Sequence, residues 1–247
     1  MFQARFLLTS KCSASCGYCH NEGQDKGDNM LMSVERVRQF METWQAQGQL
    51  PYEVVLSGGE PTLHPQVGDI AQLCHSYGVH VSMDSHGGHP ARLVKALPYI
   101  HELKLHIDSF DEAEQYQSMG IHLAPVLNSI ADAKAHNVTL LVNHPMQSVE
   151  QTTLFVQQAA NVGVDCKIIE VLDRTIQLSS GCVLSDTNWS EMGYCFTAAG
   201  FWLHSESGHR IYHKKCVDTE SITKLYIDAN QVKEGLNGRI VNSVTFS

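Results

Sequence analysis

The chain has 247 residues, of which 43% are hydrophobic and 17% charged, and its formal net charge at pH 7 is −9. This length suits one large α/β domain or a domain with a modest appendage. The acidic balance argues against nucleic-acid and anionic-membrane partners, because both select for a basic surface. Residues 1–9 lack the charged-then-apolar layout of a secretory signal, and no apolar run approaches the roughly 18 residues of a membrane span. We therefore expect a soluble, cytoplasmic protein.

Predicted strands and helices alternate along the first 172 residues. Apolar, β-rich runs predict strands over 2–9, 52–57, 79–83, 103–107, 138–142 and 166–172. Helical periodicity predicts helices over 34–48, 65–77, 90–97, 123–135 and 149–162, the first with Ser33 as its N-cap. Near-continuous apolar strands that alternate with helices indicate a parallel sheet covered by helices. Right-handed crossovers would curl this α/β series into a partial (β/α)6 TIM-like barrel.

The alternation stops after residue 173. Residues 176–188 are polar and rich in turn formers, whereas 209–217 and 222–227 are typical of strands, and Asn237-Gly238 predicts a hairpin. We predict a core of residues 1–173 and a C-terminal extension of residues 174–247 that packs against the barrel. On a strand, Arg210, Tyr212 and Lys214 would share a face, either to meet an anionic substrate group or to form a solvated edge.

Polar clusters follow each of the first five predicted strands. They are the cysteines after the first strand, Gly-Gly-Glu after the second, Ser-His-Gly after the third, Asp-Ser after the fourth and Asn-His after the fifth. The carboxyl ends of parallel barrel strands share one rim, where active sites collect. Any one cluster is explained by the turn that must end a strand. All five on one rim, together with a cysteine triplet, indicate a functional site.

Cys12, Cys16 and Cys19 form a C-x3-C-x2-C pattern in one short loop. Thiolates favour zinc, copper(I) or iron–sulfur clusters. A structural zinc site needs a fourth ligand, for which His20 is the nearby candidate. A four-iron cluster on three cysteines instead keeps one iron open for an exogenous ligand. The triplet by itself leaves these alternatives open.

Gly58, Gly59 and Glu60 follow the second predicted strand. Two glycines let a ligand approach the main chain closely, and Glu60 adds a negative charge suited to a ligand ammonium group. An isolated Gly-Gly-Glu-Pro is an ordinary turn. Combined with the cysteine pattern after the preceding strand, it resembles the radical S-adenosylmethionine (radical SAM) superfamily.

The resemblance implies that Cys12, Cys16 and Cys19 bind a [4Fe–4S] cluster whose fourth iron is chelated by the amino and carboxylate groups of SAM. It places Tyr18 near the SAM adenine and residues 58–60 at the methionine amino group. It further implies one-electron cleavage of SAM to methionine and a 5′-deoxyadenosyl radical, which abstracts hydrogen from a substrate. An electron donor such as flavodoxin or ferredoxin is the implied partner.

Within the superfamily, residues 3–172 resemble the GTP 3′,8-cyclase group of molybdenum cofactor biosynthesis. Residues 82–87 stand where that group has a strand that ends in Thr-Asn-Gly, and residues 105–111 resemble its Ser-Leu-Asp-Ser-Leu-Asp segment. The resemblance implies SAM ribose or carboxylate contacts for Ser85, His106 and Asn143. For His106 the alternative is a packed core histidine.

The late cysteines depart from the cyclase pattern. Cys182, Cys195 and Cys216 are spaced x12 and x20 instead of forming the compact C-x2-C-x13-C motif, so the chain is not expected to be the cyclase itself. They would hold an auxiliary cluster if they converge, or be small buried hydrophobes if they do not. Cys74 and Cys166 are expected in the core.

Three functions remain open from the sequence. The first is a radical SAM enzyme that acts on a small molecule or nucleotide. The second is a peptide-modifying (RiPP maturation) radical SAM enzyme. The third is a non-catalytic iron–sulfur or zinc protein, against which the Gly58–Glu60 loop argues, because a simple metal site has no use for an amino-group-binding loop.

Overall fold

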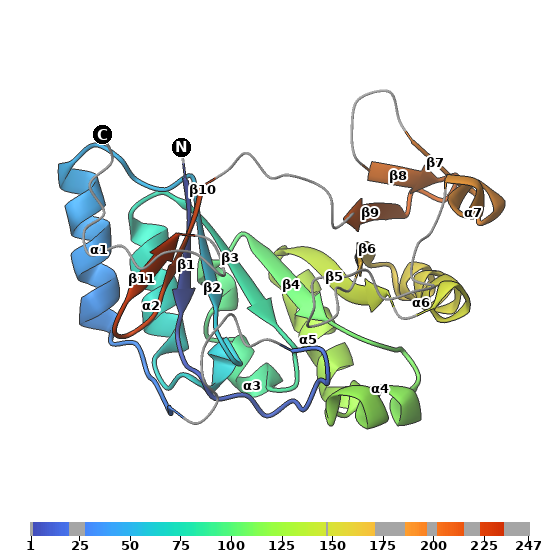
Figure 1. The fold of residues 1–247 in the computed structure, drawn as a ribbon, viewed down its shortest axis with the longest axis horizontal. Coiled ribbons are helices and arrows are strands. Elements are labelled where there is room, and N and C mark those ends of the chain that lie inside the picture. The colour runs from blue at the N-terminus through green and yellow to red at the C-terminus, as the bar shows by residue number, and fades with distance from the viewer. Residues whose placement is uncertain are drawn as a thin grey trace.

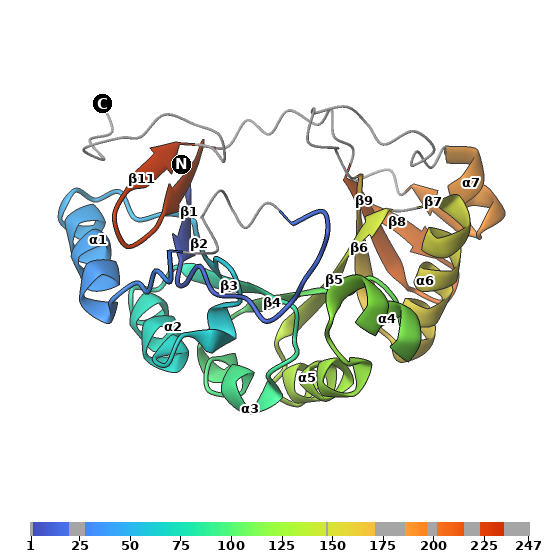
Figure 2. The same ribbon diagram turned by 60° about the horizontal axis from the view of Figure 1, so that its bottom comes forward.

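The computed structural model describes residues 2–19, 28–146, 148–170, 186–196, 202–214 and 223–234. They form one strongly curved sheet with helices on its outer side (Figures 1 and 2). The sheet has eleven strands in the order β11-β10-β1-β2-β3-β4-β5-β6-β9-β8-β7. Within these ranges no helix is both long and apolar enough to cross a membrane.

The central six strands follow chain order and are parallel, as the sequence predicts. Their bounds are β1 (Phe2–Leu7), β2 (Glu53–Ser57), β3 (His80–Ser85), β4 (Glu102–His106), β5 (Thr139–Met146) and β6 (Asp165–Glu170). The α/β class and the partial barrel are therefore confirmed. Every carboxyl end lies on the side reached by the dark-blue cysteine loop in Figure 1.

The segments after residue 173 extend the same sheet at both edges. On one side β9 (Arg210–Lys214) pairs parallel with β6 and is followed outward by antiparallel β8 (Trp202–Ser205) and β7 (Tyr194–Phe196). On the other side β10 (Thr223–Ile227) pairs parallel with β1 and forms a hairpin with β11 (Val232–Glu234). The parallel part thus has eight strands instead of six. The predicted hairpin at Asn237-Gly238 lies outside the described residues.

Six α-helices cover the outer face between the central strands. They are α1 (Val34–Ala46), α2 (Val67–Ser76), α3 (Pro90–Leu93), α4 (Glu112–Met119), α5 (Leu123–Ala135) and α6 (Val149–Val162), and α7 (Asp186–Glu191) lies beside β7. Ser33 caps α1 as predicted, since its side chain accepts a hydrogen bond from the N–H of Arg36. The predicted helix over 90–97 is instead α3 followed by a 3-10 turn at Leu97–Tyr99.

Helix α4 was not predicted from the sequence. Its apolar periodicity is weak, but Asp111 accepts hydrogen bonds from the N–H groups of Ala113 and Glu114, and Gly120 ends the helix with φ +69°. An aspartate N-cap followed by glutamates and closed by glycine is a sequence signal for a helix that periodicity alone misses.

The two faces of the central strands differ sharply in polarity. Alternate residues such as Phe2, Phe6 and Leu56 join the hydrophobic core under the helices, and the ring of Phe2 meets that of Trp44 edge-on at 5.2 Å. A parallel sheet that is open on one side can carry polar groups there, because strand residues alternate between the faces. The inner, concave face is accordingly charged.

Ion pairs cross the concave face from strand to strand. Arg5 on β1 donates to Asp84 on β3 at 2.6 Å, and Lys104 on β4 donates to Glu53 on β2 at 3.1 Å. Burial alone would raise the pKa of Asp84, but the Arg5 guanidinium and the Lys104 ammonium hold it below its ordinary value. The interior of the barrel therefore carries fixed, ionised groups.

His144 on β5 is the opposite case, a histidine that burial keeps neutral. Its ring stacks on Phe155 at 3.9 Å, Nδ1 donates to the carbonyl of Ile107 at 3.2 Å, and Nε2 is buried with no hydrogen-bond partner among the described residues. Burial lowers the pKa of His144 to about 4. Protonation therefore favours the unfolded chain.

We predict that the free energy of unfolding falls as pH falls from 6.5 to about 4, because over this range the unfolded chain binds a proton at residue 144 and the folded chain does not. The loss attributable to His144 is on the order of 3 kcal/mol. Urea unfolding of His144→Phe, which keeps an aromatic ring on Phe155, should show a shallower pH dependence. Replacing the exposed His136 by Gln is the control, and an equally reduced slope there would contradict the assignment.

Candidate active site

The cysteine loop begins on a segment that is hydrogen-bonded to the end of β2. The N–H of Leu8 donates to the carbonyl of Ser57 at 2.9 Å, that of Gly59 to Thr9 at 2.7 Å and that of Glu60 to Lys11 at 2.8 Å. Backbone hydrogen bonds alone thereby bring together the cysteine motif at residues 12–19 and the Gly-Gly-Glu motif at residues 58–60, which are far apart in the sequence. The Gly-Gly-Glu loop and the first residues of the cysteine loop form one unit.

The two glycines are required by this close approach. A Cβ on Gly59 would lie 2.2 Å from the carbonyl oxygen of Lys11, and one on Gly58 would lie 2.6 Å from that of Thr9. Gly58 also has φ +125°, which L side chains rarely adopt. The sequence suggested that the glycines make room for a ligand. In the structure they make room for residues 9–11.

The Glu60 carboxylate, 1% exposed, organises the loops around it. Its Oε1 accepts from the N–H and hydroxyl of Thr62 and from the hydroxyl of Ser85, at 3.0, 2.6 and 2.8 Å. Its Oε2 accepts from the N–H of His86 at 2.9 Å. A buried carboxylate is tolerated when it is satisfied in this way. Glu60 thus holds the carboxyl ends of β2 and β3 together.

Ser13 links the cysteine loop to the segment after β3. Its Oγ lies 3.0 Å from Nε2 of His86 and 2.9 Å from Nε2 of His89. The N–H of Gly88 donates to Nδ1 of His86, so this nitrogen is an acceptor and the neutral ring carries its proton on Nε2. His86 therefore donates to Ser13, and the Ser13 hydroxyl also lies within hydrogen-bond distance of His89.

Tyr18 anchors the other end of the loop to β4. Its hydroxyl donates to Oδ1 of Asp108 at 2.6 Å and lies 2.8 Å from Nε2 of His106, and the Tyr18 and His106 rings stack at 5.5 Å. Burial and the Asp108 carboxylate raise the pKa of Tyr18, so the hydroxyl stays protonated. The side chain of His106 is 31% exposed, which contradicts the alternative that it is a packed core histidine.

Helix α4 supports this arrangement from behind. Gln115 accepts from the N–H groups of both Asp108 and Ser109, and the hydroxyl of Ser118 donates to Asp108. The carbonyl of Met119 accepts from the N–H of Ser15 at 2.8 Å. The helix that sequence periodicity missed is thus one of the supports of the cysteine loop.

The three cysteines are half-buried or exposed, whereas Cys74 and Cys166 are buried as predicted. Burial raises the pKa of Cys16 to about 11. Among the described residues, one group of potential ligands has all its atoms within 4.8 Å, and it contains no cysteine. A single tetrahedral zinc would hold its sulfurs about 3.8 Å apart. Cys12, Cys16 and Cys19 do not form such a group, so their three thiols are not gathered at the spacing of a single zinc ion.

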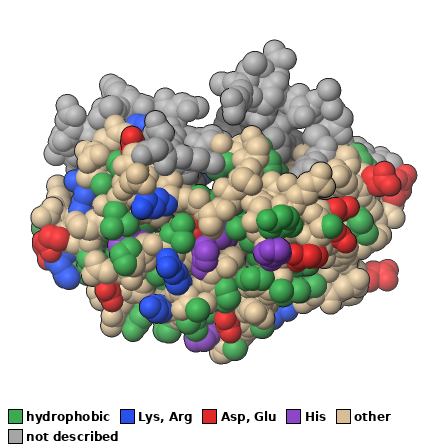
Figure 3. All heavy atoms as spheres, turned by 90° about the horizontal axis from the view of Figure 1, so that it is seen from below, with side chains coloured by type: hydrophobic (Ala, Val, Ile, Leu, Met, Phe, Trp, Pro, Cys, Tyr) green, Lys and Arg blue, Asp and Glu red, His purple; other side chains and the backbone are tan. Residues whose placement is uncertain are grey.

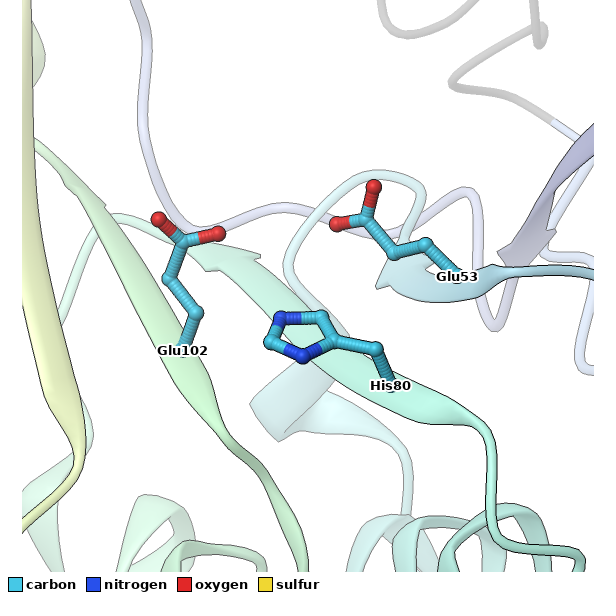
Figure 4. A group of neighbouring side chains, drawn as sticks. All are labelled: Glu53, His80 and Glu102. Carbon is cyan, nitrogen blue, oxygen red and sulfur yellow. The ribbon is translucent and has the colours of Figure 1, made fainter.

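The group within 4.8 Å consists of Glu53, His80 and Glu102, the first residues of β2, β3 and β4 (Figure 4). It lies at the amino ends of the strands, away from the cysteine loop. The Lys104 ammonium stands 3.1 Å from both carboxylates, which already provides them with a cation. We interpret this cluster as an ion-pair network and not as a metal site.

Asn143 on β5 carries an unsatisfied acceptor. Its neighbour in register on β4 is His106, and its Oδ1 is buried with no hydrogen-bond partner among the described residues. A buried acceptor without a donor costs roughly 1–3 kcal/mol. A ligand hydroxyl at this position would remove that cost.

The structure describes some of the residues that the sequence singles out after residue 173 and not others. Cys195 lies in β7, and Cys182 and Cys216 lie outside the described residues, as does His20. Arg210 is held by Asp165 through Nε at 2.8 Å, and the Lys167 ammonium lies 5.5 Å from the centre of the Tyr212 ring. Arg210 is therefore part of an ion pair between β9 and β6.

The model of the family described as the radical SAM superfamily matches residues 6–157. The chain belongs to the radical SAM superfamily. The superfamily implies a [4Fe–4S] cluster and SAM. The matched range contains the cysteine loop, the Gly58–Glu60 loop and the rim up to β5.

Partial similarity extends to probable GTP 3′,8-cyclases of archaea. The protein of Pyrococcus horikoshii is 34% identical over 83 residues, which cover 34% of this chain and 26% of the relative. That of Saccharolobus solfataricus is 36% identical over 102 residues, 41% of this chain and 30% of the relative. The matches thus span about a third of the length of these relatives or less.

Solved structures show the same fold over a larger part of the chain. SuiB of Streptococcus suis bound to S-adenosylmethionine has a TM-score of 0.71 at 14% identity and covers 94% of this chain and 59% of its own. Methylornithine synthase has a TM-score of 0.58 at 17% identity and covers 76% and 60%. At these identities the likeness establishes the partial-barrel fold and no shared substrate.

We predict that Gly59→Ala lowers the free energy of unfolding by roughly 2–4 kcal/mol, because the new Cβ collides with the carbonyl of Lys11. Gly17→Ala is the matched control, since nothing lies within 4 Å of a Cβ at that position. Urea unfolding of both variants measures the difference. Equal free energies of unfolding for the two variants would show that the carbonyl of Lys11 does not lie this close to Gly59.

Proposed function

We propose that Cys12, Cys16 and Cys19 hold the [4Fe–4S] cluster of this radical SAM enzyme. The observation that supports the proposal is the backbone link between residues 8–11, where the cysteine loop begins, and residues 57–60, because it brings the loop beside the Gly-Gly-Glu motif. Tyr18 and Ser13 fasten the loop at two further points. When bound, the cluster would supply one electron for the cleavage of SAM to methionine and a 5′-deoxyadenosyl radical, and that radical would take a hydrogen atom from the substrate.

We assign the different groups of SAM to different residues of the rim. Because the Glu60 carboxylate is occupied by Thr62, Ser85 and His86, we assign the methionine amino group to the main chain of Gly58 and Gly59. Glu60 and Ser85 then act by holding that main chain in place. This assignment keeps the predicted role of the loop and changes the atoms that perform it.

We assign the ribose of SAM to Asn143 and His106, which would bind its hydroxyl groups. The unsatisfied Oδ1 of Asn143 needs a donor, which a ribose hydroxyl offers and a methionine carboxylate does not. Tyr18 stacks on His106 and is held by Asp108, and this fixed ring supports the proposal that Tyr18 lies near the SAM adenine. The protein thereby orients SAM before the reaction and limits the access of water to it.

The substrate is proposed to be a small polar molecule or a nucleotide. The concave face below the rim carries the Arg5–Asp84 pair and the Lys104 network, which would bind charged and hydroxyl groups better than apolar ones. Peptide modification remains the second candidate. Flavodoxin or ferredoxin is the proposed electron donor.

The test is anaerobic reconstitution with iron and sulfide, followed by addition of dithionite and SAM. The parent protein should produce 5′-deoxyadenosine, and replacing Cys12, Cys16 and Cys19 together by Ala should abolish it, because the cluster loses its ligands. Cys74→Ala and Cys166→Ala are matched controls that remove core thiols and should retain the reaction. Equal 5′-deoxyadenosine from the triple variant and the parent would refute the proposal.

The same triple variant tests whether an auxiliary cluster sits on Cys182, Cys195 and Cys216. About four residual irons per chain after reconstitution would support it, and none would exclude it. Cys195 already lies at the sheet edge in β7, so convergence of the other two on that edge is the structural requirement.

A further inference from the structure

Ser13 lies between Cys12 and Ala14 in the cysteine loop, and the N–H of Ala14 points at the sulfur of Cys12. The N–H of Ala14 donates to Sγ of Cys12 at 3.4 Å. The peptide that carries this N–H joins Ser13 to Ala14, so its orientation depends on how the Ser13 side chain is held. Hydrogen bonds to the sulfur ligands are among the factors that set the reduction potential of an iron–sulfur cluster.

The Ser13 hydroxyl is held from both sides by imidazoles. It accepts from Nε2 of His86 at 3.0 Å and lies 2.9 Å from Nε2 of His89. Because hydrogen bonds to two imidazoles hold the hydroxyl, the Ser13 side chain has one strongly favoured orientation. Ser13 is exposed, so this anchoring does not come from burial.

The anchor is itself rigid. His86 is 5% exposed, its Nδ1 accepts from the N–H of Gly88, and its Nε2 lies 3.3 Å from the Glu60 carboxylate. Gly88 has no room for a side chain, because a Cβ there would lie 2.9 Å from the His86 ring. The position of Ser13 is therefore set by the same Glu60-centred unit that holds the Gly-Gly loop.

We propose that Ser13 is a positioning residue that raises the reduction potential of the cluster through the Ala14 N–H that it holds toward Cys12. The inference rests on the proposed cluster ligation by Cys12, Cys16 and Cys19. An N–H donor stabilises the sulfur more when the cluster has gained an electron, because the reduced cluster is the more negative one. Loosening Ser13 therefore makes reduction harder, without removing any cluster ligand.

The experiment is a redox titration of the reconstituted protein, followed by electron paramagnetic resonance of the reduced cluster. Ser13→Ala should keep the iron content of the parent and lower the reduced-to-oxidised ratio at a fixed potential by threefold or more. A tenfold change corresponds to 59 mV for a one-electron couple. Ser13→Thr keeps the hydroxyl and should restore the parent potential.

Ser15→Ala is the matched control, since it removes a hydroxyl from the same loop but leaves both imidazole contacts in place. If it shifts the potential as much as Ser13→Ala does, the effect is a general loosening of the loop and the proposal is wrong. An unchanged potential in Ser13→Ala also overturns it. Absence of iron from the parent protein would instead refute the proposed function.

A second measurement on the iron-free protein covers the case in which Ser13→Ala binds no iron. Hydrogen exchange of the Ala14 amide should become at least threefold faster in Ser13→Ala and stay at the parent rate in Ser15→Ala. An unchanged Ala14 rate in Ser13→Ala would contradict the proposal whatever the iron content.

Discussion

The backbone bonds between residues 8–11 and the end of β2 are the constraint on which the rest of the site depends. They bring the cysteine loop to the Gly58–Glu60 loop without any side chain, and they leave no space for a Cβ at either glycine. Glu60 then ties β3 to this pair of loops, and Tyr18 ties in β4 through Asp108. The carboxyl ends of four strands are thereby fixed relative to three thiols, which is the preorganisation that a cofactor-dependent radical reaction requires.

Charged side chains lie both on the outer surface (Figure 3) and on the concave face of the sheet. In the view from below (Figure 3), most basic side chains lie on the left half of the face, histidines lie near its middle, and acidic side chains lie on both sides. Below the rim the ion pairs of Arg5 and Lys104 cross the concave face. The central strands thus contribute to the hydrophobic core on one side and carry ion-paired polar groups on the other. His144 lies on the core side, where burial lowers its pKa. Protonation of this side chain therefore lowers the stability of the folded chain.

The sequence predicted the fold well where periodicity and turn residues agree. Six strands, the Ser33 cap and the positions of the cysteine and Gly-Gly-Glu loops could be predicted, because local propensity and hydrophobic pattern determine them. Pairing of β10 with β1 and of β9 with β6 could not, since both contacts join segments far apart in sequence. Helix α4 was missed because its signal is in its caps. The roles of Glu60 and the glycines needed coordinates, because a motif identifies residues but does not show which atoms remain available to a ligand.

The central claim is that the two loops are assembled before any cofactor binds, and amide hydrogen exchange of the iron-free protein tests it most directly. The N–H groups of Gly59 and Glu60 donate to the carbonyls of Thr9 and Lys11, so both should exchange far more slowly than the exposed amide of Gly17. Protection of Gly59 and Glu60 before iron is added would support the account. Exchange of both amides as fast as that of Gly17 would contradict it.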